Sequence, residues 1–351
     1  MKKSPEQIMD YARRFCKGLR ATQAANFVAL CDALALLRTC ILSRLAGAIS
    51  GPQRHCHRLK RLWRLVSNPR FPAKAVMDAI CLHNFKAALS IGARRIVLLD
   101  FTALHHPFSA LVAAVPIGGR AVPLLLWPCI PSEFERSQNT FVEEMLAHLK
   151  GLIGDFTLVA DRGFGHEQII RACRILGIAF VLRIRSDVIM DAGTRIAPAG
   201  EFAPRHGARY YPNALYGKQH KEKVNFVAVA SGTDPWLLIT SLSDMRRARA
   251  LYRRRMEIEQ SFKDIKSYLN LDKAMVRTVE RLLVIATAVM AVHSFFLWLG
   301  FVASRSPLAA KLICSGTEKA GYVFIAINLL LAFPSLLGPL YQRMGRLLES
   351  G

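Results

Sequence analysis

The spacing of hydrophobic residues changes along the chain and divides it into regions of different secondary structure. Residues 1–85 are dense in Ala and Leu and lack the alternation typical of strands, so they predict helices. From about residue 94 the pattern shifts to short apolar runs separated by turn residues. These runs predict strands at 95–99, 109–116, 121–127, 156–160 and 178–183, with helices at 139–152 and 166–176.

The order of these elements favours an α/β fold. Gly118 and Gly119 predict a two-residue hairpin turn between the second and third strands. Three strands followed by helix, strand, helix and strand are what a ribonuclease-H-like mixed sheet with helices on its faces requires. Residues 186–242 are richer in Gly, Pro, Tyr and Lys and predict a strand-rich insertion, with strands at 224–230 and 236–241. A helix is predicted from about 245 to 269, and the remaining chain is helical and apolar.

The charge of the chain points to a polyanionic partner. The formal net charge is +23, from 48 Lys and Arg against 25 Asp and Glu. Residues 1–86 alone hold 16 basic and 4 acidic residues. Nucleic acid fits this imbalance best, because neutralised phosphates release counterions; an anionic membrane surface is the alternative. The eight cysteines form no Cys-x-x-Cys pair and the start is polar, so we expect reduced thiols in the cytoplasm.

One predicted helix in the basic N-terminal part, residues 54–66, is amphipathic. Arg58 and Arg61 share one face with Arg54, and apolar residues share another. Such a face suits contact with the DNA backbone. The alternative is a solvated face on a structural helix.

Residues 282–303 contain one His and no charged residue. A segment of this length can cross a membrane. A fully buried helix gives the same pattern. We favour burial, because no other stretch looks membranous and the chemical signals lie just upstream.

Two acids follow buried apolar runs. Asp100 and Asp161 each come directly after a predicted strand, where a sheet presents ligands to a cleft. Hard cations such as Mg²⁺ prefer carboxylate oxygens, and two such ions can activate water and stabilise a leaving oxygen in phosphoryl transfer. The alternative for either acid is an Asp that caps the following turn.

A third acid lies in a more informative pattern. Tyr252, Arg255, Glu259 and Lys266 stand at offsets 0, 3, 7 and 14, within roughly a 60° arc of one helix. Glu259 can bind metal, Arg255 and Lys266 can neutralise phosphates, and Tyr252 can donate a hydrogen bond to phosphate or stack on a sugar or base. The alternative is a solvated face with incidental salt bridges.

With these motifs the chain resembles the DDE transposases of bacterial insertion sequences, specifically the insertion-sequence-four family. That family's Tyr-x2-Arg-x3-Glu-x6-Lys signature is present from Tyr252 to Lys266 without a gap. Its two Asp motifs are matched by Asp-Phe-Thr from Asp100 and Asp-Arg-Gly-Phe from Asp161. Gln138-Asn139 matches a pair often found near the start of the preceding helix. The resemblance covers roughly residues 95–300.

The resemblance implies an activity and its partners. It implies Mg²⁺-dependent nicking at transposon ends, with Mn²⁺ as a substitute, followed by attack of the freed 3′ hydroxyl on target DNA. Asp100, Asp161 and Glu259 would be the catalytic metal ligands. Double-stranded DNA carrying terminal inverted repeats would be the partner of a homodimer. Some relatives hold a flipped base against a Trp of the insertion; Trp236 is the matching candidate, with a core Trp as the alternative.

We therefore predict a basic helical DNA-binding region at 1–88, a catalytic core at 89–185 and 243–285, the insertion at 186–242 and an apolar helical region at 286–351. The predicted protein is a bacterial cytoplasmic, nucleoid-associated transposase with no membrane partner. The alternatives are a structure-specific metal-dependent nuclease and an inactive, domesticated DNA-binding protein. Asp155, Asp187, Asp191 and Asp264 are expected to lie outside the site.

Overall fold

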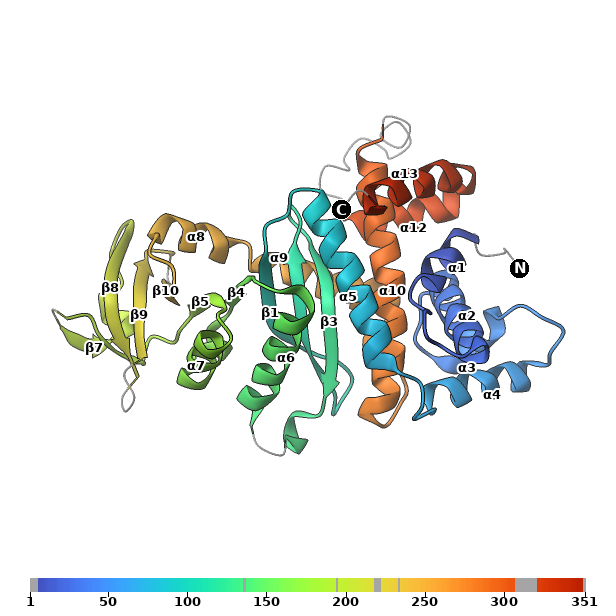
Figure 1. The fold of residues 1–351 in the computed structure, drawn as a ribbon, viewed down its shortest axis with the longest axis horizontal. Coiled ribbons are helices and arrows are strands. Elements are labelled where there is room, and N and C mark those ends of the chain that lie inside the picture. The colour runs from blue at the N-terminus through green and yellow to red at the C-terminus, as the bar shows by residue number, and fades with distance from the viewer. Residues whose placement is uncertain are drawn as a thin grey trace.

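The computed structural model describes residues 6–134, 137–193, 195–217, 222–232, 234–306 and 321–349 (Figure 1). The molecule is elongated, with strands of the insertion at one end, the strands of the core in the middle and helices at the other end. The N-terminal part is helical, as predicted. Its helices are α1 (Glu6–Arg13), α2 (Ala21–Leu37), α3 (Leu42–Ala48), α4 (His55–Val66) and α5 (Ala73–Ser90).

The central strands confirm the ribonuclease-H-like prediction. β1 lies between β2 and β4, antiparallel to β2 and parallel to β4, and β5 continues the parallel part. The resulting order, β3-β2-β1-β4-β5, is that of the ribonuclease-H-like sheet. Gly118 and Gly119 both have positive φ and form the predicted turn between β2 and β3. The strands are β1 (Ile96–Ala103), β2 (Ser109–Pro116), β3 (Ala121–Cys129), β4 (Thr157–Ala160) and β5 (Ala179–Arg183).

Helices cover this sheet. Successive residues of β2, β3 and β4 are buried, so both faces of these strands are covered. α6 (Gln138–Ile153) and α7 (Glu167–Ile175) pack against each other, and α5 packs against β3. Short 3₁₀ turns join some elements: η1 (Pro131–Glu133), η2 (Arg162–Phe164), η3 (Ala199–Phe202), η4 (Leu271–Lys273) and η6 (Pro334–Leu336).

The insertion is strand-rich, and it extends the sheet of the core. β10 pairs antiparallel with β5, and the order continues β9-β8-β6-β7, so ten described strands form one sheet. The sequence did not indicate this junction, because strand pairing over long separations leaves no local signal. The added strands are β6 (Ile189–Asp191), β7 (Ile196–Pro198), β8 (Ala208–Tyr216), β9 (Glu222–Val229) and β10 (Trp236–Thr240).

The helix predicted from about 245 to 269 is two helices. α8 (Met245–Arg253) ends before Arg254, and α9 (Met256–Leu269) begins after Arg255. No Pro or Gly marks this break. α8 packs against β4 and β5, while α9 packs against β1, β2 and β3.

The apolar residues 282–303 lie in the helix α10 (Val279–Ser304), and nearly all residues of this helix are buried by other parts of the protein. It contacts α2, α5 and β3, together with α12 (Tyr322–Ala332) and α13 (Leu337–Glu349). Among the described residues, α10 is long and apolar enough to cross a membrane, and two bent helix pairs would qualify only if each counted as one span. In an apolar 18-residue stretch of this helix, 94% of the residues are buried inside the protein, which confirms the expected burial.

Candidate active site

Asp100 and Asp161 are neighbours across the sheet. Leu99 on β1 lies opposite Ala160 on β4, so the next residues along these parallel strands are the two acids. β4 ends there, as predicted. The expectation that Asp100 also follows a strand was wrong, because β1 continues to Ala103 and Asp100 pairs with Val112 of β2. The side of Asp100 that faces β4 is open because β4 has stopped, and this brings the two carboxylates together.

Glu259 joins them through Arg255. Nη1 of Arg255 lies 3.3 Å from Oδ2 of Asp100 and 3.4 Å from Oδ2 of Asp161, and Nη2 lies 2.7 Å from Oε1 of Glu259. The Arg255 side chain is only 11% exposed. Three acids from three distant elements thus converge on one guanidinium, and the break between α8 and α9 places Arg255 among them.

Burial sets the electrostatics of this cluster. Burial raises the pKa of Asp100 to about 6, although Arg255 and the backbone N–H of Phe101 oppose that rise. Asp161 and Glu259 add to it, because like charges disfavour ionisation. Burial alone would lower the pKa of Arg255, but the three acids raise it above its usual value. The cluster therefore holds more negative charge than one arginine can balance.

Tyr252 supports the second acid. Its hydroxyl donates a hydrogen bond to Oδ1 of Asp161 at 3.0 Å, and its side chain is buried. Burial and the charge of Asp161 raise the pKa of Tyr252, so the phenol keeps its proton. The half-buried Trp236 packs edge-on against Tyr252, with ring centroids 5.2 Å apart. The insertion thus reaches the candidate site through Trp236.

Two aromatic residues of the Asp motifs connect β1 to the segment that follows β4. Phe101 follows Asp100, Phe164 ends the Asp-Arg-Gly-Phe motif, and their rings stack with centroids 5.7 Å apart. A side chain on Gly165 would lie 2.8 Å from the carbonyl oxygen of Arg183, so the chain passes too close there for any residue but glycine. These contacts give Phe101, Phe164 and Gly165 a structural role near the two acids.

The sequence analysis missed three residues around Asp161. Nη1 of Arg183 lies 4.0 Å from Oδ1 of Asp161, and Nη2 lies 2.6 Å from Oδ1 of Asp234. Arg162 also pairs with Asp234, at 2.8 Å. Arg183 ends a buried strand next to the acid-bearing one, and this position was its available signal. Asp234 lies in the insertion far along the chain and gave none.

The other predicted DNA-binding residues lie apart from the acids. Lys266 is half-buried on α9, two turns beyond Glu259, and its amino group has no ion pair or hydrogen bond within the described part of the chain. Arg58 and Arg61 do not lie on an open face. Arg58 donates to the carbonyl of Ile49 at 2.6 Å, and Arg61 donates to the side chain of Asn26.

The fully exposed basic side chains of α4 and its N-cap are different ones. Arg54, Lys60 and Arg64 are exposed. Arg58 and Arg61 instead donate hydrogen bonds to the C-terminal end of α3 and to α2. The amphipathic helix was predicted, and Arg54 is exposed as expected, but Arg58 and Arg61 are held by hydrogen bonds, and the other exposed basic residues are Lys60 and Arg64. Asp264, an expected bystander, is buried on α9, where burial raises its pKa to about 6 and Arg120 opposes the rise.

The donor set fits a hard divalent cation, because all three converging groups are carboxylates. Within the described ranges, no three Asp, Glu, His or Cys side chains are gathered closely enough to hold a metal ion. The acids surround Arg255 instead, and its guanidinium supplies the balancing charge.

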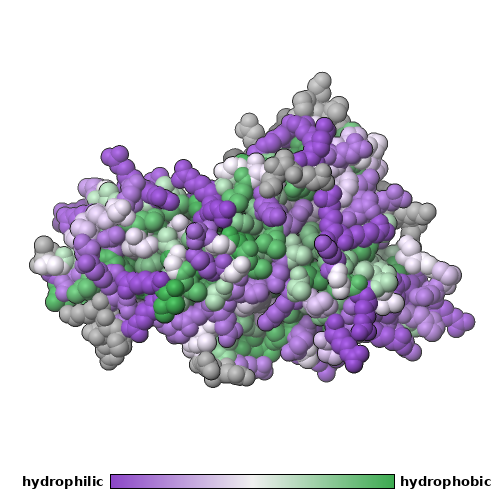
Figure 2. Space-filling view, viewed as in Figure 1, coloured by the Kyte–Doolittle hydropathy of each residue, from purple (hydrophilic) through white to green (hydrophobic). Residues whose placement is uncertain are grey.

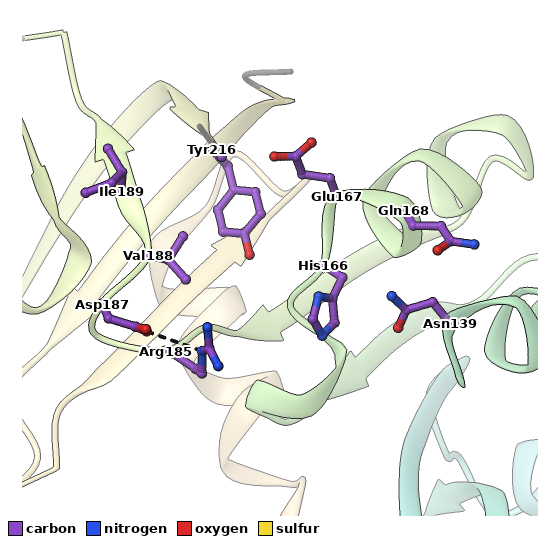
Figure 3. Close-up of a pocket in the computed structure, with 10 residues that line it drawn as sticks. Asn139, His166, Glu167, Gln168, Arg185, Asp187, Val188, Ile189 and Tyr216 are labelled. Carbon is purple, nitrogen blue, oxygen red and sulfur yellow. Dashed lines mark ion pairs between the residues drawn. The ribbon is translucent and has the colours of Figure 1, made fainter. Parts of the chain in front are cut away.

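A polar pocket of about 440 Å³ lies where the core meets the insertion (Figure 3). Its lining includes Asn139 at the start of α6, His166 just after η2, and Tyr216 at the end of β8. Arg185 and Asp187, which form an ion pair at 3.2 Å, line the side that follows β5. Residues of the core and of the insertion therefore line this pocket together.

Comparison with known proteins bears on this arrangement. Residues 135–295 match the family model of the transposase DDE domain. The matched range includes Asp161, Tyr252, Arg255 and Glu259 but not Asp100. No curated protein matches the chain. Among solved structures, the piggyBac transposase synaptic complex with hairpin DNA resembles it at 11% identity and a TM-score of 0.47, over 97% of this chain and 82% of that one.

Residues 135–295, less than half of the chain, are thus similar to the transposase DDE domain. This similarity does not extend to the insertion-sequence-four assignment, which stays a resemblance carried by the Tyr252–Lys266 signature.

Proposed function

We propose that this protein is a DNA transposase that cleaves phosphodiester bonds at the ends of a mobile element and transfers the freed 3′ hydroxyl to target DNA. The observation that carries the proposal is the convergence of Asp100, Asp161 and Glu259 on one guanidinium, from β1, the end of β4 and α9. The transposase DDE family match over Asp161 and Glu259 supports it independently.

The chemistry follows from the chain's own residues. Asp100, Asp161 and Glu259 would hold Mg²⁺ or Mn²⁺, which would activate the attacking oxygen and stabilise the leaving one. Tyr252 fixes Asp161 by a hydrogen bond, so this ligand is oriented before DNA arrives. Arg255 is the nearest cation, and it can pass from the carboxylates to a DNA phosphate as the scissile group enters. Lys266, two turns along α9, would neutralise a neighbouring phosphate.

The test is cleavage of a labelled duplex made from the DNA that flanks the coding sequence. Asp100→Asn, Asp161→Asn and Glu259→Gln should each abolish cutting, because each removes one carboxylate from the metal ligand set. DNA binding, measured by gel shift, should persist, since it rests on Lys and Arg. Full cutting activity in any of the three variants would refute this triad.

Asp155→Asn is the matched control. The Asp155 side chain is 89% exposed, and its partner is Lys150, at 2.6 Å, so its loss should leave cutting unchanged. Joining of the cut end to a second DNA should accompany cutting. A protein that cuts but never joins would be a structure-specific nuclease with the same site.

A further inference from the structure

The helix α8, which leads directly into the candidate site, carries arginines that no acid balances. Its buried side is formed by Ala248, Leu251 and Tyr252. Arg246 and Arg253 are exposed on the opposite side, and Arg247 is exposed on the flank next to Leu251, with which it lines a hollow. Their guanidinium groups form no ion pair or hydrogen bond in the part of the chain that the structure describes. The helix itself contains no acidic residue; its N-cap, Asp244, accepts hydrogen bonds from the backbone N–H groups of Arg246 and Arg247 and forms no ion pair with their guanidinium groups within the described residues.

The surroundings of α8 extend this basic surface. Hydrophilic side chains project from the surface over α8 (Figure 2). Arg247 shares a hollow of about 590 Å³ with Arg94 and Arg95, which precede β1. The acid of this hollow, Asp155, is paired with Lys150, and its charge also interacts with that of Arg95; it pairs with neither Arg94 nor Arg247 in the described part of the chain. The basic surface therefore runs along α8 and past its first turn.

The position of α8 relative to the acids sets what this surface can hold. Tyr252, on the buried side of the last turn, contacts Asp161, and Arg253 is the next residue. Arg246 lies seven residues earlier, about 10 Å along the helix axis. That length corresponds to about three base-pair steps of B-DNA at 3.4 Å each. A DNA backbone that lies along α8 would end at the carboxylates.

We infer that Arg246, Arg247 and Arg253 form a track that binds consecutive DNA phosphates next to the scissile one. The inference rests on the proposed function and adds to it the surface by which the DNA end is aligned. Arginine suits this task because its planar group binds a phosphate through two hydrogen bonds and stays charged.

The test is DNA affinity as a function of salt, measured without metal so that no cutting occurs. The triple variant Arg246→Gln, Arg247→Gln, Arg253→Gln is compared with wild type on a fluorescent duplex between 50 and 200 mM KCl. Three lost phosphate contacts should lower the log–log salt slope by about 2.7, so the variant's affinity should fall about 40-fold less than that of wild type over this range. The triple Lys variant should retain the slope.

The matched control is Arg343→Gln with Arg346→Gln, two exposed arginines on α13 at the other end of the molecule. This control should keep the wild-type slope, and all variants should unfold at the wild-type temperature. A Gln triple variant with an unchanged slope, in a protein that still cuts DNA, would overturn the track and leave the proposed function standing. A wild-type protein that neither binds nor cuts DNA would overturn the proposed function.

Discussion

The electrostatics of the acid cluster predict that Asp100→Asn stabilises the metal-free protein while it abolishes cutting. Asp100 has a pKa of about 6, against 3.8 for an ordinary Asp, because the folded protein buries it beside two other acids. The folded chain therefore holds a proton on Asp100 more tightly than the unfolded chain does. Stability should fall as the pH rises from about 4 to 6, and the ionised carboxylate should remain a cost at neutral pH.

The magnitude follows from this shift. A difference of about 2 pKa units corresponds to about 3 kcal/mol, which is the upper limit of what the neutral amide can recover. For a chain of 351 residues, an unfolding entropy of about 2.1 cal/mol/K per residue converts this to a rise in Tm of about 4 °C. Asp161→Asn should act in the opposite direction, because it weakens the bond from Tyr252 and removes the ion pair with Arg255.

The assay is thermal unfolding at pH 8 in excess chelator, repeated with 5 mM Mg²⁺ or Mn²⁺. Metal should raise the Tm of wild type by mass action and should raise that of Asp100→Asn much less, since one ligand is missing. The difference in Tm between Asp100→Asn and wild type should thus narrow or change sign when metal is added. If Asp100→Asn lowers the Tm in chelator as much as Asp161→Asn does, burial of an uncompensated charge is the wrong account of Asp100.

Three further predictions concern Arg255, Trp236 and two arginines of α4. Arg255→Gln should raise the affinity for Mn²⁺ in the absence of DNA about tenfold, because a cation that competes for the carboxylates is gone. Paramagnetic resonance measures this affinity, and weaker binding would contradict the prediction. Trp236→Ala should lose roughly 1–3 kcal/mol of binding to the element's end if the ring stacks on a base, with Trp236→Phe losing less; unfolding of the Ala variant would show instead that Trp236 supports Tyr252. Arg58→Ala with Arg61→Ala should lower the Tm and leave the salt slope of DNA binding unchanged, and a reduced slope would assign them to DNA.

Local sequence patterns predicted the strands of the core closely. The second strand begins and ends where its apolar run does, at Ser109–Pro116, and Gly118 and Gly119 turn the chain as expected. Both features depend on residues next to one another. The same holds for α10, whose apolar composition predicted a buried helix.

What the sequence could not show depends on contacts between distant residues. Nothing at Arg254 or Arg255 disfavours helix, so the periodicity predicted one continuous helix. In the folded protein Arg255 is paired with acids on β1 and β4, and Arg254 is paired with Glu257, where the helix breaks. The joining of β10 to β5 and the pairing of Arg183 with Asp234 are likewise contacts between separate segments.

The same limit applied to α4. Its amphipathic pattern was correct, but which basic residues face outward depends on what α2 and α3 offer them. Arg58 and Arg61 reach Ile49 and Asn26, and this left Arg54, Lys60 and Arg64 in solvent.

The central position of α10 has a consequence for synthesis of the protein. Asn84 of α5 donates to the carbonyl of Pro123 on β3 and to Ser294 of α10, and it accepts from Trp298. About 190 residues separate the end of α5 from the start of α10. At 5–20 residues per second, the ribosome takes about 10–40 s to supply the helix that covers these surfaces. A nascent or truncated chain that stops before Val279 would therefore expose the apolar faces of α2, α5 and β3 together, and a chaperone or protease would meet it before DNA does.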